Sequence, residues 1–102
     1  MSDWIRVAAL EDIPRQGARV LQHEEGDIAV FRTVADEVFA LRDRCPHKGG
    51  QLSQGMVFER KVACPLHGRQ ICLDTGEVVA PDEGCVRAYP VKVEEGLVYL
   101  QI

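Results

Sequence analysis

The 102-residue sequence lacks a sustained helical pattern and a long hydrophobic run. No window of about eleven residues or more repeats apolar side chains at helical spacing, which argues against a helical fold. No apolar stretch approaches the ~20 residues that a membrane-spanning helix needs, and the first residues lack a charged and then apolar leader. The sequence therefore predicts a cytoplasmic protein with no membrane partner.

Basic runs and catalytic side-chain sets are missing as well. The chain has 12 lysines and arginines against 16 aspartates and glutamates, a formal net charge of −4, and no basic cluster typical of nucleic-acid binding. There is no Ser/His/Asp set, no pair of acidic residues in an evident cleft and no glycine-rich phosphate loop. We therefore expect a carrier or a subunit rather than a catalyst. Its mildly acidic surface fits docking onto a more basic partner, although it fits many other proteins too.

Short apolar runs separated by turn residues fill the chain. Period-two alternation over 89–94 and 98–102 is typical of half-buried strands, and Pro14 limits residues 10–13 to a turn or one helical turn. Strands of this length at close spacing predict one all-β domain over residues 1–102, a sandwich or small barrel. The predicted strands span residues 4–8, 18–22, 28–33, 38–42, 56–59, 61–63, 70–73, 89–94 and 98–102.

Four residues are spaced as two metal-binding pairs. One residue separates Cys45 from His47, and two residues separate Cys64 from His67. Both pairs fall in predicted loops, at about 44–51 and 63–69, each of which follows a strand. Proline stiffens each loop and glycine lets its backbone turn tightly, so the two loops can meet at one tip and clamp a metal centre.

The donor set suits two kinds of metal centre. Two thiolates and two imidazoles can hold a [2Fe–2S] cluster in which histidines replace two cysteines on one iron. The same four side chains could hold zinc, but paired zinc ligands more often have about two to four residues between them, with like ligands paired together. The spacing therefore favours the cluster, and zinc stays open as an alternative.

The other cysteines and most aromatic residues are expected to serve packing. A cysteine outside a disulfide or metal site usually behaves as a small core residue, so we expect Cys72 and Cys85 to be buried or half-buried thiols. Four aromatic residues lie in apolar runs and are expected in the core: Trp4, Phe31, Phe39 and Phe58.

The motifs Cys-Pro-His at 45–47 and Cys-Pro-Leu-His-Gly at 64–68 resemble those of Rieske [2Fe–2S] proteins. This resemblance implies an antiparallel β sandwich that carries one cluster per chain, in a cluster-binding subdomain at one tip. It also implies that Cys45 and Cys64 bind one iron, that His47 and His67 bind the other, and that the cluster transfers one electron at a time.

Two features of high-potential Rieske proteins are absent. Their additional cysteines would fall at Gly50 and Leu66, and the serine that usually follows the glycine of the second motif is Arg69 here. Without the disulfide and the hydroxyl donor, the resemblance implies a midpoint potential toward the low end of the Rieske range, which starts near about −150 mV.

A narrower resemblance, from Arg44 onward, is to the small subunit of assimilatory NAD(P)H nitrite reductase. It rests on the motifs at 44–50, 52–55, 82–86 and 89–94. It implies an electron-transfer subunit in nitrate assimilation, not catalytic alone, whose partner is a large subunit that carries flavin, [4Fe–4S] and sirohaem. A Rieske ferredoxin that donates electrons to a ring-hydroxylating dioxygenase remains an alternative, as does a zinc-stabilised binding module without a redox role. Segment 82–86 favours the nitrite reductase subunit over the ferredoxin.

Overall fold

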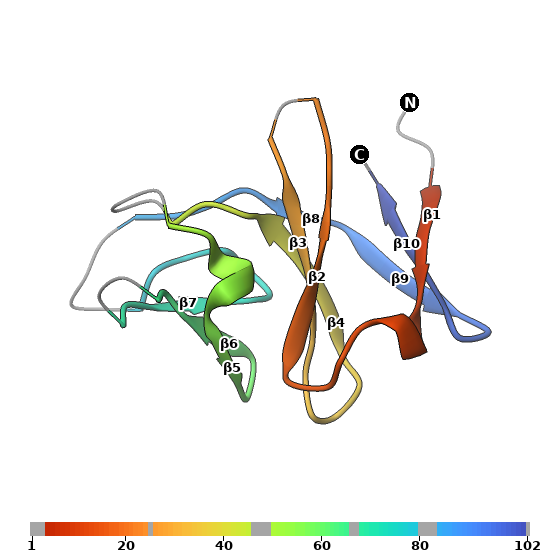
Figure 1. The fold of residues 1–102 in the computed structure, drawn as a ribbon, viewed down its shortest axis with the longest axis horizontal. Helices are drawn as coiled ribbons and strands as arrows, with labels where there is room; N and C mark the ends of the chain where they lie inside the picture. Colours follow the sequence, from red (N-terminus) through yellow and green to blue (C-terminus); the bar gives the residue numbers. More distant parts are fainter. Residues whose placement is uncertain (1–3, 25, 46–49, 66–67, 80–83, 102) are drawn as a thin grey trace.

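The described part of the chain folds into three antiparallel sheets, which confirms the all-β prediction. The computed structural model describes residues 4–24, 26–45, 50–65, 68–79 and 84–101 (Figure 1). Sheet A has the strand order β1-β10-β9, sheet B the order β2-β3-β4-β8, and sheet C the order β5-β6-β7. The elements are β1 (Trp4–Ala9), η1 (Leu10–Asp12), β2 (Gly17–Leu21), β3 (Ile28–Arg32), β4 (Val38–Arg42), η2 (Leu52–Gln54), β5 (Met56–Phe58), β6 (Lys61–Ala63), β7 (Gln70–Cys72), β8 (Ala88–Tyr89), β9 (Val91–Glu94) and β10 (Leu97–Gln101), where η marks a 3-10 helix.

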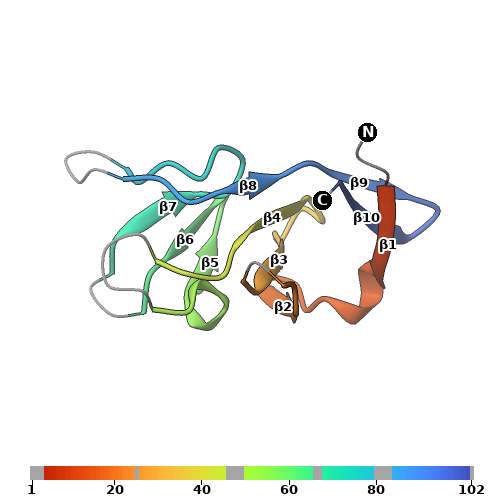
Figure 2. The same cartoon turned by 90° about the horizontal axis from the view of Figure 1, so that it is seen from above.

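Sheet B lies between the other two sheets, with sheet C at one end of the molecule and sheet A at the other (Figures 1 and 2). Its strand β3 is buried on both faces. Ala29 and Phe31 belong to the core that includes sheet C, and Ile28 and Val30 belong to the core that includes sheet A. Because successive side chains of a strand point to opposite faces, a strand covered on both sides must be apolar throughout.

Two buried cores follow from this arrangement. The first lies between sheets B and C and contains Ala29, Phe31, Leu41, Cys45, Leu52, Val57, Val62, Cys64, Ile71, Leu73 and Val86. The second lies between sheets A and B and contains Ile13, Ile28, Val30, Val38, Ala40, Tyr89, Val98 and Leu100. We call the part built from residues 44–87 the cluster-loop region and the rest, which holds sheets A and B, the base.

One predicted strand is two strands in the structure. Residues 89–94 divide at Pro90, so that β8 pairs with β4 in sheet B and β9 pairs with β10 in sheet A. Proline has no N–H for a strand ladder, while its carbonyl still accepts a hydrogen bond from Gln101 N (3.1 Å). Pro90 therefore stands where the chain passes from one sheet to the next.

The predicted aromatic core is partly wrong. Phe31 is fully buried and Phe39 and Phe58 are half-buried, but 39% of Trp4 is exposed. Trp4 lies on the edge strand β1, where the Lys92 Nζ atom lies 4.9 Å from the centre of its ring. The indole therefore covers a lysine on the outside of sheet A instead of entering the core.

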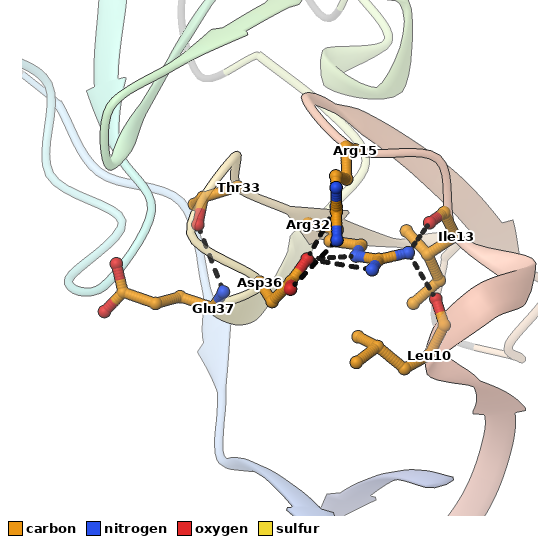
Figure 3. A network of polar contacts seen from close by, with 7 residues as sticks. All are labelled: Leu10, Ile13, Arg15, Arg32, Thr33, Asp36 and Glu37. Atoms are coloured by element: carbon orange, nitrogen blue, oxygen red, sulfur yellow. Dashed lines mark hydrogen bonds and ion pairs between the residues drawn. The ribbon is translucent and has the colours of Figure 1, made fainter. Parts of the chain in front are cut away.

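A polar network joins η1 to the hairpin of β3 and β4 (Figure 3). The Arg32 guanidinium donates hydrogen bonds to the carbonyl oxygens of Leu10 (3.1 Å) and Ile13 (2.9 Å). Its Nε atom also donates to Asp36 (3.0 Å), which accepts a further bond from Arg15 at the same distance. These contacts tie η1 to the β3–β4 turn within the base. None of the helices formed by the described residues is long and apolar enough to cross a membrane.

Candidate metal centre

The two predicted cysteine ligands lie in the same buried core. Cys45 is 2% exposed and follows β4, and Cys64 is 3% exposed and follows β6 directly. Both belong to the core between sheets B and C. The other two predicted ligands, His47 and His67, lie outside the described residues. The structure therefore brings together the sulfur half of the predicted set.

Both cysteine loops close in the same way. The Cys45 N–H donates to the carbonyl of Gly50 (2.6 Å), five residues later, and the Cys64 N–H donates to the carbonyl of Arg69 (2.7 Å), also five residues later. In the second loop, Gly68 N–H returns a hydrogen bond to the Cys64 carbonyl (2.9 Å). The backbone of each cysteine is thus fixed by its own loop, which holds the two thiols at set positions in the core.

A second contact closes the first loop from outside. The Asp43 carboxylate is buried and accepts hydrogen bonds from the N–H and the hydroxyl of Ser53, both at 2.7 Å. Asp43 follows the end of β4 and Ser53 lies in η2, next to the fully buried Leu52. This pair ties η2 to the end of β4 across the 45–50 loop. The sequence motif at 52–55 contains Ser53, but nothing in it identifies Asp43 as its partner.

The segment after β7 returns to the second cysteine loop. Val79 N–H donates to the Gln70 carbonyl (2.9 Å), directly beyond that loop, and Val78 N–H donates to Gly84 (3.0 Å). The intervening residues 80–83, which include part of the 82–86 motif, lie outside the described residues. Their two flanking ends are anchored beside β7.

The remaining cysteines differ from each other. Cys72 is half-buried, as predicted, but Cys85 is exposed, so the prediction for Cys85 is wrong. The backbones of Cys85 and Glu77 form an isolated antiparallel β-bridge at the margin of sheet C. The next residue, Val86, is buried in the core. The apolar neighbour occupies the core site, and the thiol faces outward.

The chemistry of the described donors fits an iron–sulfur cluster. Cysteine thiolates are the usual protein ligands of such clusters, and both sulfurs here come from tight loops at the end of a buried core. Within the described residues no group of three or more His, Cys, Asp and Glu side chains could hold a metal ion. A complete ligand set therefore requires residues beyond those, as the motifs with His47 and His67 predict.

Comparisons with known proteins agree with this chemistry. The chain is 36% identical over 98 residues to the 3-phenylpropionate/cinnamic acid dioxygenase ferredoxin subunit of Photorhabdus laumondii, covering 94% of this chain and 91% of that protein. The ferredoxin of carbazole 1,9a-dioxygenase from Nocardioides aromaticivorans has a similar structure, with a TM-score of 0.84, 28% identity and 98% of each chain covered. A Mycobacterium tuberculosis protein assigned as an NADH-dependent nitrite reductase small subunit gives a TM-score of 0.86 at 22% identity, covering 98% of this chain and 95% of that one.

The family match covers almost the whole chain. Residues 3–101 match the Rieske-like [2Fe–2S] domain family. The cofactor is therefore a Rieske-type [2Fe–2S] cluster, and the role of the chain is electron transfer within an oxidoreductase system. With two buried cysteines in matched loops and a family match from end to end, this chain belongs to the Rieske-like [2Fe–2S] domain family.

Proposed function

We propose that this chain is the ferredoxin component of a ring-hydroxylating dioxygenase system and passes single electrons to the terminal oxygenase. The observation that carries the proposal is the 36% identity to a dioxygenase ferredoxin subunit over nearly the full length of both proteins. The nitrite reductase subunit, which the motif at 82–86 favoured, is not confirmed. This chain is 22% identical in sequence to the protein assigned as a nitrite reductase small subunit, and an identity this low supports a shared fold alone.

The cluster ligands proposed are Cys45 and Cys64 on one iron and His47 and His67 on the other. A bound cluster of this type exchanges one electron at a time, at a potential raised by the exchange of two thiolates for neutral imidazoles. The protein holds the two thiols in a buried core and fixes their backbones through the Gly50 and Arg69 carbonyls. Burial keeps water away from the sulfurs, which is one of the factors that set the potential.

Ligand substitutions test the site. Cys45→Ser, Cys64→Ser, His47→Ala and His67→Ala are each expected to abolish the Rieske EPR signal of the dithionite-reduced protein. Cys72→Ser and Cys85→Ser are matched controls and should keep about two irons and two sulfides per chain. Retention of the signal in any of the four ligand variants would contradict the assignment. A colourless, zinc-containing protein after anaerobic reconstitution would favour the zinc-stabilised module instead.

The partner is tested by reoxidation of the reduced protein. We expect the terminal oxygenase of a 3-phenylpropionate dioxygenase to reoxidise the reduced chain faster than the large subunit of an NAD(P)H nitrite reductase does. Stopped-flow absorbance measures both rates at equal partner concentrations. A faster reaction with the nitrite reductase subunit would overturn the proposed function and favour a nitrite reductase small subunit, as the sequence motifs suggested.

A further inference from the structure

The short helix η2 lies between the two cysteine loops along the chain and touches both. It follows the loop that starts at Cys45 and leads into β5, and it is the green coil of Figure 1. Its first residue, Leu52, is fully buried in the core that also contains Cys45 and Cys64. A single 3-10 turn leaves most of its backbone groups without a partner inside the helix, so it does not hold a fixed position by itself. Contacts from outside therefore decide where η2 lies.

Asp43 fixes the start of η2. In the described part of the chain, the side chain of the N-cap residue Gln51 makes no capping hydrogen bond. The buried Asp43 carboxylate takes its place, with one oxygen accepting the Ser53 N–H and the other accepting the Ser53 hydroxyl, both at 2.7 Å. The Asp43 N–H in turn donates to the Asp27 carbonyl in the base (2.8 Å). Hydrogen bonds to an ionised group are shorter and stronger than neutral ones, so this contact anchors the start of η2 to the base.

Gly55 fixes the end of η2 against the second cysteine loop. Its N–H donates to the Leu52 carbonyl (2.9 Å) and closes the helix. A Cβ atom on Gly55 would lie 2.1 Å from the Ala63 carbonyl oxygen, which belongs to the peptide bond between Ala63 and Cys64. The φ angle of −81° is open to any residue, so this position requires glycine for close approach and not for backbone freedom. The end of η2 is thus seated directly on the peptide that precedes Cys64.

We propose that Asp43, Ser53 and Gly55 are positioning residues that set the spacing of Cys45 and Cys64 through η2. The inference rests on the proposed function, in which both cysteines bind one iron. Two sulfurs on one metal lie within a narrow range of distances, and such a site has to be held to within about 0.5 Å. The bonds from each cysteine N–H to the end of its own loop shape the two loops separately. The contacts of η2 relate one loop to the other.

Matched substitutions at Asp43 separate the hydrogen bonds from the charge. Asp43→Ala and Asp43→Asn change the net charge equally, but asparagine can still accept the Ser53 N–H and donate to the Ser53 hydroxyl. We expect Asp43→Ala to speed the loss of iron to EDTA at neutral pH about ten-fold, because removing a group that orients a metal ligand typically weakens metal binding about 10–100-fold. It should also shift the g values of the dithionite-reduced protein. Asp43→Asn should stay within about two-fold of the unsubstituted rate and keep the g values. Equal rates of iron loss in the two variants would overturn the proposal.

Gly55→Ala tests the other end of η2. The new methyl group meets the Ala63 carbonyl, so we expect faster iron loss and shifted g values. Gly96→Ala is the matched glycine control, because its methyl group would meet nothing within 4 Å. Leu100→Ala lowers stability from the core that lacks the cysteines and controls for destabilisation alone. If iron loss follows the urea midpoint in all these variants, Leu100→Ala included, the three residues act on folding only and the proposal fails.

The pair can also be tested from the serine side, which keeps the proposal open to refutation if Asp43→Ala does not fold. Ser53→Ala loses the hydroxyl bond and keeps the N–H bond, whereas Ser53→Thr keeps a hydroxyl. We expect Ser53→Ala to speed iron loss and Ser53→Thr to restore it, and equal rates in these two variants would contradict the proposal. An unsubstituted protein that takes up no cluster fails the proposed function. A normal EPR signal together with iron loss that is insensitive to all these substitutions fails this inference alone.

Discussion

The cluster-loop region and the base are stabilised in different ways. The base has strands of up to six residues, and β3 within it is buried on both faces, so side-chain packing defines it. The three strands of sheet C have three residues each. Here two glycines lie directly against backbone: a Cβ atom on Gly55 or Gly76 would lie 2.1 Å from a carbonyl oxygen. In the base, one on Gly17 would lie 2.7 Å from a side-chain carbon of Pro14, and one on Gly96 would meet nothing within 4 Å. The region that holds the cysteines therefore adds close backbone approach, at Gly55 and Gly76, to an apolar core, whereas the base rests on longer strands and apolar side chains.

Truncation of a core side chain in each region should have the largest effect. Leu100→Ala in the base and Ile71→Ala in the cluster-loop region each remove a fully buried side chain, so each should lower the free energy of unfolding by about 2–5 kcal/mol. Of these two residues, Ile71 lies in the core that contains Cys45 and Cys64, and Leu100 lies in the other core. We therefore expect Ile71→Ala to speed the loss of iron to a chelator, and Leu100→Ala to leave that rate nearly unchanged in the folded protein. Equal rates of iron loss in the two variants would show that the two cores act as one.

Replacing each of two glycines that have similar φ angles by alanine separates the cost of a steric clash from the cost of backbone strain. Gly76 has φ +79° and Gly96 has φ +75°, so alanine should cost about 1–2 kcal/mol at either position from the left-handed conformation. At Gly76 the new methyl group also meets the Val86 carbonyl, and overpacking adds about 1–3 kcal/mol. Urea denaturation should therefore place Gly76→Ala clearly below Gly96→Ala in stability. Equal losses would mean that the 72–76 turn moves freely against Val86.

The base could be predicted well from the sequence because its pattern is local. The apolar run of β3 and the turn residues on either side of it identify the strands β2, β3 and β4 to within a residue or two of their ends. The division at Pro90 was missed because alternation continues through it, and pattern alone does not say which sheet a strand joins. Trp4 was misplaced because an apolar run on an edge strand need not be covered on both faces.

The site could be predicted only where the spacing of cysteine and histidine residues in the sequence indicates metal ligands. The cysteine positions follow from their motifs, and their burial in one core agrees with a shared centre. The contact between Asp43 and Ser53 could not be predicted, because it pairs two common polar residues ten positions apart that only the folded chain brings together. Cys85 was placed inward because thiols are usually buried, but its orientation is decided by the neighbouring Val86, which occupies the core.

Loss of one hydroxyl in each region should have a smaller effect. Ser53→Ala removes a hydrogen bond to the buried Asp43 carboxylate, and bonds to charged groups contribute about 1.5–3 kcal/mol. Thr33→Val in the base removes a neutral bond, in which the Thr33 hydroxyl accepts the Glu37 N–H (3.1 Å), worth about 0.5–1.5 kcal/mol. We expect Ser53→Ala alone to shift the midpoint potential measured by voltammetry, because Asp43 and Ser53 enclose the Cys45 loop. A potential shift with Thr33→Val as large as that with Ser53→Ala would count against a positioning role for this pair.

The smallest expected effect concerns the ion pair that joins the two regions. Hydrogen bonding to Arg60, in the turn after β5, holds the pKa of Glu37 below its ordinary value, and hydrogen bonds from Arg15 and Arg32 do the same to the pKa of Asp36 within the base. A carboxylate with a lowered pKa in the folded state stabilises the fold at pH values above its unfolded pKa, and this contribution is lost as the pH falls through the folded pKa. The midpoint of urea denaturation should therefore decrease between about pH 5 and about pH 3.

Variants assign that decrease to one contact or the other. Glu37→Gln and Asp36→Asn should each reduce the acid-dependent part of the decrease, and Glu95→Gln, in the exposed turn after β9, serves as the matched control. Because Glu37, unlike Asp36, is hydrogen-bonded to Arg60 in the cluster-loop region, we expect Glu37→Gln but not Asp36→Asn to speed iron loss at neutral pH, by loosening the β5–β6 turn against the base. Since exposed ion pairs contribute little, this change should be small, and it disappears in high salt if its origin is electrostatic. If Asp36→Asn sped iron loss equally, the network in Figure 3 would extend to the cluster-loop region, and the boundary between the two regions would have to be redrawn.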